Sequence, residues 1–179
     1  MTLGKGIGSG FAPLGAVVIG ERIREAFRRG TGRFVHGFTY SGAPSAVFVG
    51  IQVHAIMARE ELFTRAARIG AYLEMGLRKL AEQHESIGDI RGRGLLWGLE
   101  FVADRKTRRP FTEQQQFTRR LVGHMRDNNV LVAAGLPHMN FGKDGDHIQI
   151  SPPFVISESE VNALVTALDE TLNEVSTQL

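Results

Sequence analysis

Lys5 is the residue with the clearest chemical potential near the start of the sequence, because it lies between Gly4 and Gly6 in a glycine-rich segment. A lysine amine with little side-chain bulk around it is well placed to form a Schiff base with an aldehyde, provided that its pKa is lowered enough to free the neutral amine. On spacing alone, a solvent-exposed lysine near the terminus is the commoner situation. The lysine precedes the glycines, so the segment is not a phosphate loop of the nucleotide-binding type.

A second polar segment combines His36, Phe38, Thr39 and Ser41 with Pro44. Hydroxyl groups and backbone amides ahead of a helix N-terminus form a ready anion site, in which amides and helix dipole both favour a phosphate. The same pattern is also typical of a capped helix start that binds no ligand. His36 fits a hydrogen-bonded structural histidine as well as a catalytic one.

One glycine-rich polar loop carries residue types that bind metals, namely His138, Asp144, Asp146 and His147. Their spacing matches no established ligand pattern, so we expect no metal site. Arg91 and Arg93 could form a carboxylate clamp, although alternating arginine and glycine between strands is more typical of a solvated turn.

The elements that must position these residues fall into a helix-rich first part and an α+β second part. In the first part we expect a short buried strand at 16–19, a helix at 21–29, a strand and turn at 34–42, and a helix at 45–58 that is buried on several sides. Pro44 suits the first turn of that last helix.

The second part begins with a long amphipathic helix over 61–84, whose apolar positions recur at steps of three and four. These positions are Leu62, Ala66, Ile69, Leu73, Leu77 and Leu80. Two strands follow over 87–102. We then expect a helix through Phe117, Leu121, Val122 and Met125, capped by Thr112 and Gln115, short strands at 130–133 and 147–151, and a final helix capped by Ser157 and Glu160.

Composition describes an ordinary globular protein of 179 residues with 42% hydrophobic and 22% charged residues. The net charge of +2 is too small to imply a polyanionic partner, so we expect no nucleic-acid binding. The absence of cysteine excludes disulfides and thiolate metal sites. No apolar run approaches the roughly 20 residues that cross a bilayer, so we expect a cytoplasmic protein without a membrane partner.

Taken together, several segments closely resemble the class III aminotransferases, which include the omega-transaminases. The segments are LGKGIGSGFAPLGAV at 3–17, HGFTYSG at 36–42, GDIRGRG at 88–94, EFVADRKT at 100–107 and SPPFVIS at 151–157. The resemblance implies an α/β chain with the aspartate-aminotransferase fold, type I among the pyridoxal-phosphate enzymes. It implies pyridoxal 5'-phosphate as the cofactor and transfer of an amino group from an amine to a keto acid or aldehyde.

By this resemblance, Lys5 is the Schiff-base lysine and the base that moves the proton between substrate and cofactor. Thr39 looks like the residue that reaches the cofactor phosphate across the interface of a homodimer, with Phe38 beside it. Family members that grip a substrate α-carboxylate carry an arginine where this sequence has Gln149, and an amide lacks that charged fork. Amines or omega-amino acids are therefore the expected donors. Ala43 stands where the family often has His or Asn.

The family's catalytic lysine normally lies past the middle of the chain, whereas only four residues precede Lys5 here. The resemblance therefore implies the C-terminal portion of such an enzyme, with the end of the large domain at 1–75 and an α+β small domain at 76–179. We expect this chain to be poorly active alone, and activity to need a complete enzyme or a partner chain. The alternatives are a catalytically inactive fragment and a non-catalytic interaction module.

Overall fold

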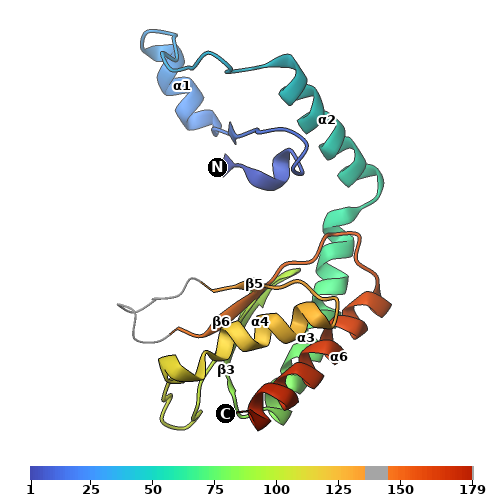
Figure 1. The fold of residues 1–179 in the computed structure, drawn as a ribbon. Helices are drawn as coiled ribbons and strands as arrows, with labels where there is room; N and C mark the ends of the chain where they lie inside the picture. The colour runs from blue at the N-terminus through green and yellow to red at the C-terminus, as the bar shows by residue number, and fades with distance from the viewer. Residues whose placement is uncertain (136–144, 179) are drawn as a thin grey trace. The chain divides into compact units, whose positions relative to one another are not determined.

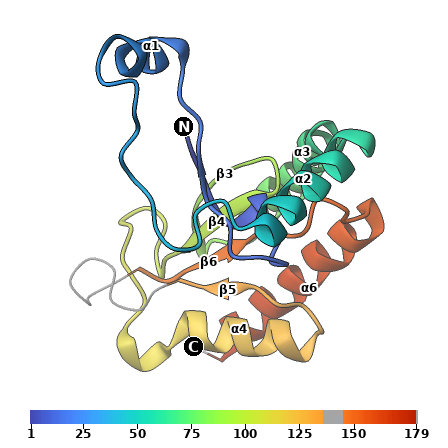
Figure 2. The same cartoon turned by 90° about the horizontal axis from the view of Figure 1, so that it is seen from above.

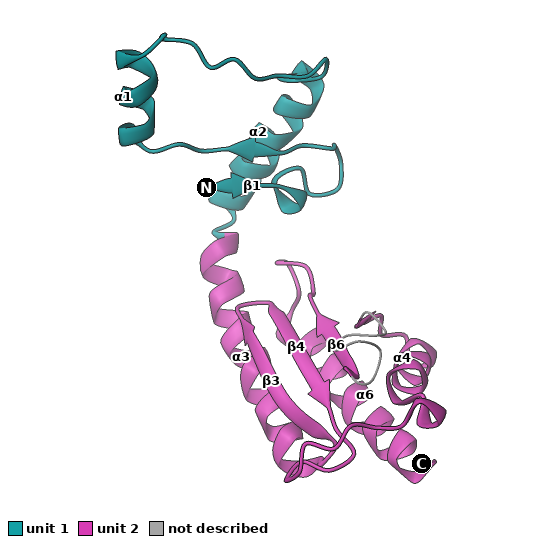
Figure 3. Cartoon of the chain, turned by 90° about the vertical axis from the view of Figure 1, so that its left-hand side faces the viewer, with its two compact units in different colours: residues 1–61 teal, residues 62–179 magenta. Residues whose placement is uncertain are grey.

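The structure, a computed structural model, describes residues 1–135 and 145–178 and divides into two compact units. Unit 1 comprises residues 1–61 and unit 2 comprises residues 62–179 (Figure 3). The compact units therefore divide just before the long helix of unit 2 begins. The expected boundary between residues 75 and 76 falls inside that helix, and as a division between the domains of a whole enzyme it stays a prediction.

Unit 1 consists of a pair of two-residue strands, one short 3-10 turn and two helices (Figure 1). These elements are β1 (Thr2–Leu3), η1 (Lys5–Ile7), β2 (Ala16–Val17), α1 (Glu21–Arg29) and α2 (Pro44–Arg59). The expected helix at 21–29 is confirmed with the same ends, and its acidic first residue and basic last residues suit the helix dipole. Pro44 occupies the first turn of α2 as expected.

Unit 1 lacks the buried packing that its apolar sequence indicates. Within residues 1–61 the only buried residues are Gly8 and Gly50. The strand expected at 16–19 is present only over Ala16–Val17, and it is not buried within this chain, since Val17 is 69% exposed. The helix expected at 45–58 is present, but its apolar residues are not covered within this chain, since Phe48 is 61% and Ile51 59% exposed.

The segment expected as a strand at 34–42 forms no strand. Residues 33–38 have no regular structure and are followed by a turn over 39–42. A strand needs a neighbour to complete its hydrogen-bond ladder, and within the described chain no strand pairs with this segment.

Unit 2 contains a four-stranded antiparallel sheet with helices packed on one face (Figures 1 and 2). Its elements are α3 (Leu62–Gln83), β3 (Ile87–Arg93), β4 (Leu96–Phe101), η2 (Glu113–Gln115), α4 (Phe117–Asp127), β5 (Ala133–Ala134), β6 (His147–Ile150) and α6 (Glu158–Thr177). The strand order is β3-β4-β6-β5, so β4 and β6 are the central strands. The two strands expected over 87–102 are thereby confirmed.

Helix α3 forms because its apolar residues recur along one face, and that face is buried. The six apolar positions expected to face the core are all buried, and Leu73 and Leu77 are fully so. This face of α3 packs against strand β3 of the sheet and against helix α6. Strand β4 contributes alternate residues to the same core, and β6 adds Ile148 and Ile150 from the same face. Residues between them, such as Gly98 and Gln149, therefore lie on the other face of the sheet.

The ends of the other helices agree in part with the sequence. Ser157 caps α6 as expected, since its side-chain oxygen accepts a hydrogen bond of 3.2 Å from the backbone N–H of Glu160. Thr112 and Gln115 form the expected capping pair, but this pair caps the short turn η2 and not helix α4. Gln116 separates the two elements, because its φ of 47° is not a helical value. Among the described residues, no helix combines the length and apolarity that crossing a bilayer requires.

Candidate functional site

Lys5 opens a tight turn in unit 1. Strands β1 and β2 pair Thr2 with Val17 and Leu3 with Ala16, so the loop between them is closed at its base. Lys5 has a φ of 48°, a left-handed backbone that side chains other than glycine adopt at a cost of about 1 kcal/mol or more. Such outliers recur at functional sites, where the surrounding structure holds the strained residue in place.

Two glycines allow this loop to fold closely. A Cβ on Gly8 would lie 2.4 Å from the carbonyl oxygen of Ala12, so only glycine fits there. A Cβ on Gly50 of α2 would lie 2.5 Å from a methyl carbon of Leu14, which shows that the loop rests on that helix. Gly4 and Gly6 have open space where a side chain would be. The lysine is therefore held by its backbone while its exposed side chain remains accessible.

The turn that carries Phe38 and Thr39 is fixed by backbone and serine contacts. The N–H of Phe38 donates to the Ser41 hydroxyl at 2.9 Å, and the N–H of Ser41 donates to the Phe38 carbonyl at 2.8 Å. Gly42, with a φ of 70°, then leads the chain into α2. The Thr39 side chain is exposed and makes no hydrogen bond within the described residues. A free hydroxyl shortly before a helix N-terminus is suited to binding an anion.

A row of aromatic rings supports this turn, and sequence reasoning missed it. Phe27 of α1 contacts Phe34, Phe34 contacts His36, and His36 contacts Phe38, with ring centroids 5.6, 5.8 and 5.3 Å apart. The rings meet edge to face, the geometry that aromatic pairs favour. The alternation of aromatic residues at 34, 36 and 38 was the available signal, because alternate side chains of an extended segment point the same way. His36 is thus part of a structural row.

The residues predicted to bind the cofactor lie in two separate turns of unit 1. Lys5 is in the loop between β1 and β2, whereas Phe38 and Thr39 are in the turn before α2. Within the described chain no hydrogen bond or ion pair joins Lys5 to either of them. This arrangement is compatible with the expectation that Thr39 serves the Lys5 of another protomer, which stays a prediction.

The face of the unit 2 sheet opposite its helices contains a cavity of about 460 Å³. Arg91, Glu100 and His147 contribute to its lining. Arg91 is ion-paired with Asp89 at 3.1 Å and with Glu100 at 2.8 Å, so its charge is already balanced. The expectation that Arg91 could clamp a ligand carboxylate therefore has no support from this geometry.

The polar loop considered for metal binding is described only in part, because His138 and Asp144 lie outside the described residues. Asp146 accepts hydrogen bonds from the backbone N–H and the hydroxyl of Thr118, at 3.1 and 2.6 Å. A ring nitrogen of His147 lies 2.6 Å from the carbonyl oxygen of Gly145. Both residues have protein partners, and the described residues contain no cluster of three metal-ligating side chains.

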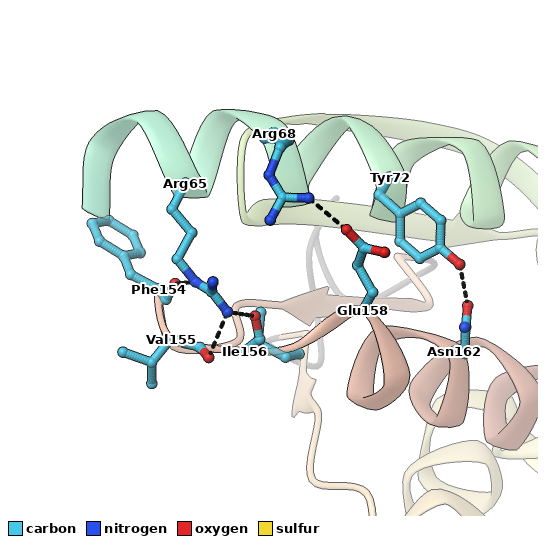
Figure 4. Close-up of polar contacts among 8 residues, drawn as sticks. All are labelled: Arg65, Arg68, Tyr72, Phe154, Val155, Ile156, Glu158 and Asn162. Carbon is cyan, nitrogen blue, oxygen red and sulfur yellow. Dashed lines mark hydrogen bonds and ion pairs between the residues drawn. The ribbon is translucent and has the colours of Figure 1, made fainter. Parts of the chain in front are cut away.

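Gln149, at the position where the related enzymes' carboxylate-binding arginine is expected, lies on the helix-free face of β6. The residues directly opposite it on the neighbouring strands are Gly98 and Ala133, neither of which has a large side chain. The Gln149 amide donates to the Ser151 hydroxyl at 3.4 Å. Sequence reasoning also missed Arg65 of α3, whose guanidinium binds the loop that follows Ser151 (Figure 4).

The chain is similar in sequence to known aminotransferases. The sequence profile of the family described as class-III aminotransferases matches residues 1–172. An uncharacterised aminotransferase of Bacillus subtilis, YodT, is 35% identical over 177 residues, which is 99% of this chain and 40% of that protein. The chain thus spans less than half the length of this relative.

Solved structures give the same result. A transaminase from the marine bacterium Virgibacillus superposes with a TM-score of 0.89 and 32% identity, over 99% of this chain and 39% of that one. An amine transaminase from an uncultivated Pseudomonas species, solved with its pyridoxal phosphate bound, gives a TM-score of 0.84 and 33% identity over 97% of this chain and 38% of its own. These matches confirm the predicted fold class, part of the α/β fold of the type I pyridoxal-phosphate transaminases.

Proposed function

The chain belongs to the class III aminotransferases, and we propose that it takes part in pyridoxal-phosphate-dependent transamination within a complete or complemented enzyme. The reaction would transfer an amino group from an amine or omega-amino acid donor to a keto acid or aldehyde. The observation that carries the proposal is Lys5, an exposed lysine held with a left-handed backbone in a glycine-rich turn.

The residues of unit 1 fit the cofactor at two of its functional groups. The Lys5 amine is suited to binding the cofactor's aldehyde covalently, since Gly4 and Gly6 leave open space beside it. The Thr39 hydroxyl and the N-terminal amides of α2 are suited to a phosphate. When bound, pyridoxal phosphate supplies an electron sink that stabilises negative charge on the substrate carbon.

Lys5 is also the proposed base. The Lys5 amine would move the proton between the substrate carbon that bears the amino group and the cofactor. The strained turn fixes the lysine backbone, which reduces the freedom lost when the side chain is aligned for proton transfer. Phe38 and Thr39 hold the cofactor phosphate, and we propose that they do so for the Lys5 of the second protomer in a homodimer.

Gln149 supports the proposed choice of substrate. Its side chain carries no charge and cannot present the bidentate fork with which an arginine binds a carboxylate. Its direct partners on the neighbouring strands are Gly98 and Ala133, which carry no charge that could take over that role. Donors whose α-carboxylate must be gripped at this point are therefore disfavoured, and amines or omega-amino acids are favoured.

We also propose that residues 1–75 close the cofactor-binding domain and that residues 76–179 form the small domain of the complete enzyme. The catalytic and phosphate-binding residues named above then all lie in the first of these parts. Gln149 would be the contribution of the second part to the substrate side of the site.

The test of this function is covalent trapping of the cofactor. The purified chain is incubated with pyridoxal phosphate and a mild reductant, and the labelled peptide is identified by mass spectrometry. We expect the label on Lys5 and its loss in Lys5→Ala, whereas Lys79→Ala, which removes an exposed lysine on α3, should label normally. Equal labelling of the wild type and Lys5→Ala would contradict the proposal and favour a non-catalytic module.

Thr39 is tested by cofactor affinity. We expect Thr39→Ala to weaken pyridoxal-phosphate binding by about tenfold, because one hydrogen bond to a charged phosphate is lost. Thr64→Ala, at an exposed threonine on α3, provides the matched control and should bind as the wild type does. Titration of the visible absorption band measures the affinity, and an unchanged value in Thr39→Ala would remove Thr39 from the site.

A further inference from the structure

The loop between β6 and α6 is bound by the guanidinium of Arg65, which lies on α3 and is far from the loop in the sequence (Figure 4). Arg65 donates from Nε to the carbonyl oxygen of Phe154 at 3.2 Å. One terminal nitrogen of Arg65 donates to the carbonyls of Val155 and Ile156, at 3.1 and 2.8 Å. The guanidinium therefore binds three consecutive backbone carbonyls about ninety positions later in the sequence.

The composition of this loop explains why it needs such a partner. Pro152 and Pro153 have no backbone N–H, so the segment cannot continue the ladder of β6. A turn follows, closed by a 3.0 Å hydrogen bond from the N–H of Ile156 to the carbonyl of Pro153. The turn directs its carbonyls toward α3, where the forked donors of an arginine bind them together. Hydrogen bonds to a charged donor are stronger than neutral ones.

The loop begins next to Gln149. Ser151 precedes the proline pair, and its hydroxyl accepts the 3.4 Å hydrogen bond from the Gln149 amide. Gly98 and Ala133, which lie directly opposite Gln149 on the two neighbouring strands, have no hydrogen-bonding side-chain group. Within the described residues, the bond to Ser151 is the one hydrogen bond that the Gln149 side chain makes. The orientation of the amide therefore depends on where the loop holds Ser151.

We propose that Arg65 is a positioning residue for substrate discrimination, acting through the loop at 151–156 on the Gln149 amide. This inference rests on the proposed function, in which Gln149 contacts the amino donor. By fixing the turn, Arg65 keeps the Gln149 amide in one orientation on the helix-free face of the sheet. Without Arg65 the loop carbonyls lose their shared donor, and the amide samples several orientations toward the donor.

Other contacts between α3 and α6 offer a control that does not involve the loop. One turn after Arg65, Arg68 forms an ion pair with Glu158, and both side chains are more than half exposed (Figure 4). An exposed pair of this kind contributes little to stability. Arg68→Gln thus removes a similar side chain from the same helix while it leaves the loop carbonyls bound.

The first experiment records the side-chain amide signals of Gln149 by NMR in the full chain, without cofactor or substrate. In Arg65→Gln we expect these signals to shift or broaden, and in Arg68→Gln to stay unchanged. Arg65→Lys should resemble Arg65→Gln, because one ammonium group cannot span three carbonyls. Fluorescence of the buried Trp97 confirms that each variant is folded. Unchanged Gln149 signals in a folded Arg65→Lys or Arg65→Gln chain would overturn the proposal.

The second experiment compares donors in the complete or complemented enzyme. The measured quantity is the ratio of kcat/KM for an aliphatic amine to that for an α-amino acid. We expect Gln149→Ala to change this ratio by about tenfold, and Arg65→Gln to change it in the same direction through KM rather than kcat. The kcat/KM ratio of the double variant should differ from that of Gln149→Ala by less than about twofold, because the two substitutions remove the same interaction.

The two hypotheses fail in different ways. An enzyme that turns over no amine donor at all contradicts the proposed function, and the NMR experiment still decides whether Arg65 orients Gln149. An active enzyme in which Arg65→Gln leaves the ratio unchanged, or in which the two substitutions act additively, overturns the positioning role and leaves the proposed function intact.

Discussion

Helix α2 of unit 1 and helix α3 of unit 2 are both rich in apolar residues, but they bury these residues to very different extents. In α3 of unit 2, every apolar residue at the expected helical steps is buried against the sheet or α6. In α2 of unit 1, only Gly50 is buried, and residues such as Phe48 remain exposed. Since hydrophobic burial is the main favourable contribution to folding, unit 2 contains most of the stabilisation that this chain provides for itself.

The contrast matches a division of roles. Unit 2 has a closed core and a fixed framework around Gln149, whereas unit 1 carries the residues proposed to bind the cofactor on turns with little packing beneath them. Exposed apolar surface of this extent typically marks a binding interface. In the complete enzyme proposed above, the rest of the cofactor-binding domain and the second protomer would cover it.

The largest expected effect concerns the core of unit 2. Leu73→Ala should lower the free energy of unfolding by about 2–5 kcal/mol, because it leaves a cavity among fully buried side chains. The single tryptophan, Trp97, lies in the same core, so its fluorescence during urea unfolding reports on unit 2. Phe48→Ala, at an exposed position of α2, should leave that transition within about 0.5 kcal/mol of the wild type. A comparable loss in both variants would refute the contrast between the units.

A smaller effect is expected from the same substitution at one helical glycine in each unit. A Cβ on Gly70 of α3 would lie 2.3 Å from the backbone oxygen of Gly94, so Gly70→Ala should destabilise the chain by about 1–3 kcal/mol. A Cβ on Gly50 of α2 would meet only the flexible end of Leu14. Gly50→Ala should therefore be nearly neutral, because the higher helix propensity of alanine offsets the small displacement of Leu14. Thermal unfolding followed by circular dichroism compares the two, and equal melting temperatures would contradict this account.

The accuracy of the sequence predictions follows the same division. The periodicity of α3 predicted its buried face residue by residue, because a helix with one covered face must repeat its apolar positions. In unit 1 the apolar run at 16–19 predicted a buried strand, whereas the structure contains a two-residue strand that is exposed. Apolar character indicates that a segment favours burial, but it does not identify the surface that covers it.

The candidate site was predictable only where it depends on local sequence. Lys5, Phe38 and Thr39 were identified through the resemblance of short segments to the class III aminotransferases, and their roles stay predictions. The left-handed backbone of Lys5 and the aromatic row through Phe34 depend on three-dimensional packing. The contact of Arg65 with the loop after β6 joins residues far apart in the sequence, so no periodicity or spacing indicates it.

A third prediction concerns association through the exposed residues of unit 1. We expect Phe48→Lys to shift the chain toward smaller assemblies, because a charge on this apolar surface opposes its burial in a contact. Met75→Lys provides the matched control. Met75 lies on α3 of unit 2 and is 67% exposed, against 61% for Phe48. Light scattering at several concentrations measures the mass distribution. Equal shifts in both variants would show that unit 1 has no special part in association.

The smallest expected effect is a pH dependence at the N-terminus of α6 in unit 2. Hydrogen bonds from the Ser157 side chain and backbone hold the pKa of the Glu160 carboxyl below its ordinary value of 4.5. A carboxyl with a lowered pKa in the folded state stabilises the fold above that ordinary value, and the contribution disappears as the pH falls through the folded-state pKa.

Ser157→Ala should accordingly lower the melting temperature by about 2–4 °C at neutral pH, and by less in acid. The difference in melting temperature between the wild type and Ser157→Ala does not vanish in acid. The Ser157 hydroxyl also accepts a hydrogen bond from the Glu160 N–H at 3.2 Å, and this bond does not depend on pH. Glu160→Gln separates the two contributions, since an amide oxygen still accepts from the Ser157 N–H but carries no charge. Its melting temperature should therefore vary less with pH between about 3 and 5 than that of the wild type. An equal pH dependence in the two proteins would show that this carboxyl does not contribute to the stability of unit 2.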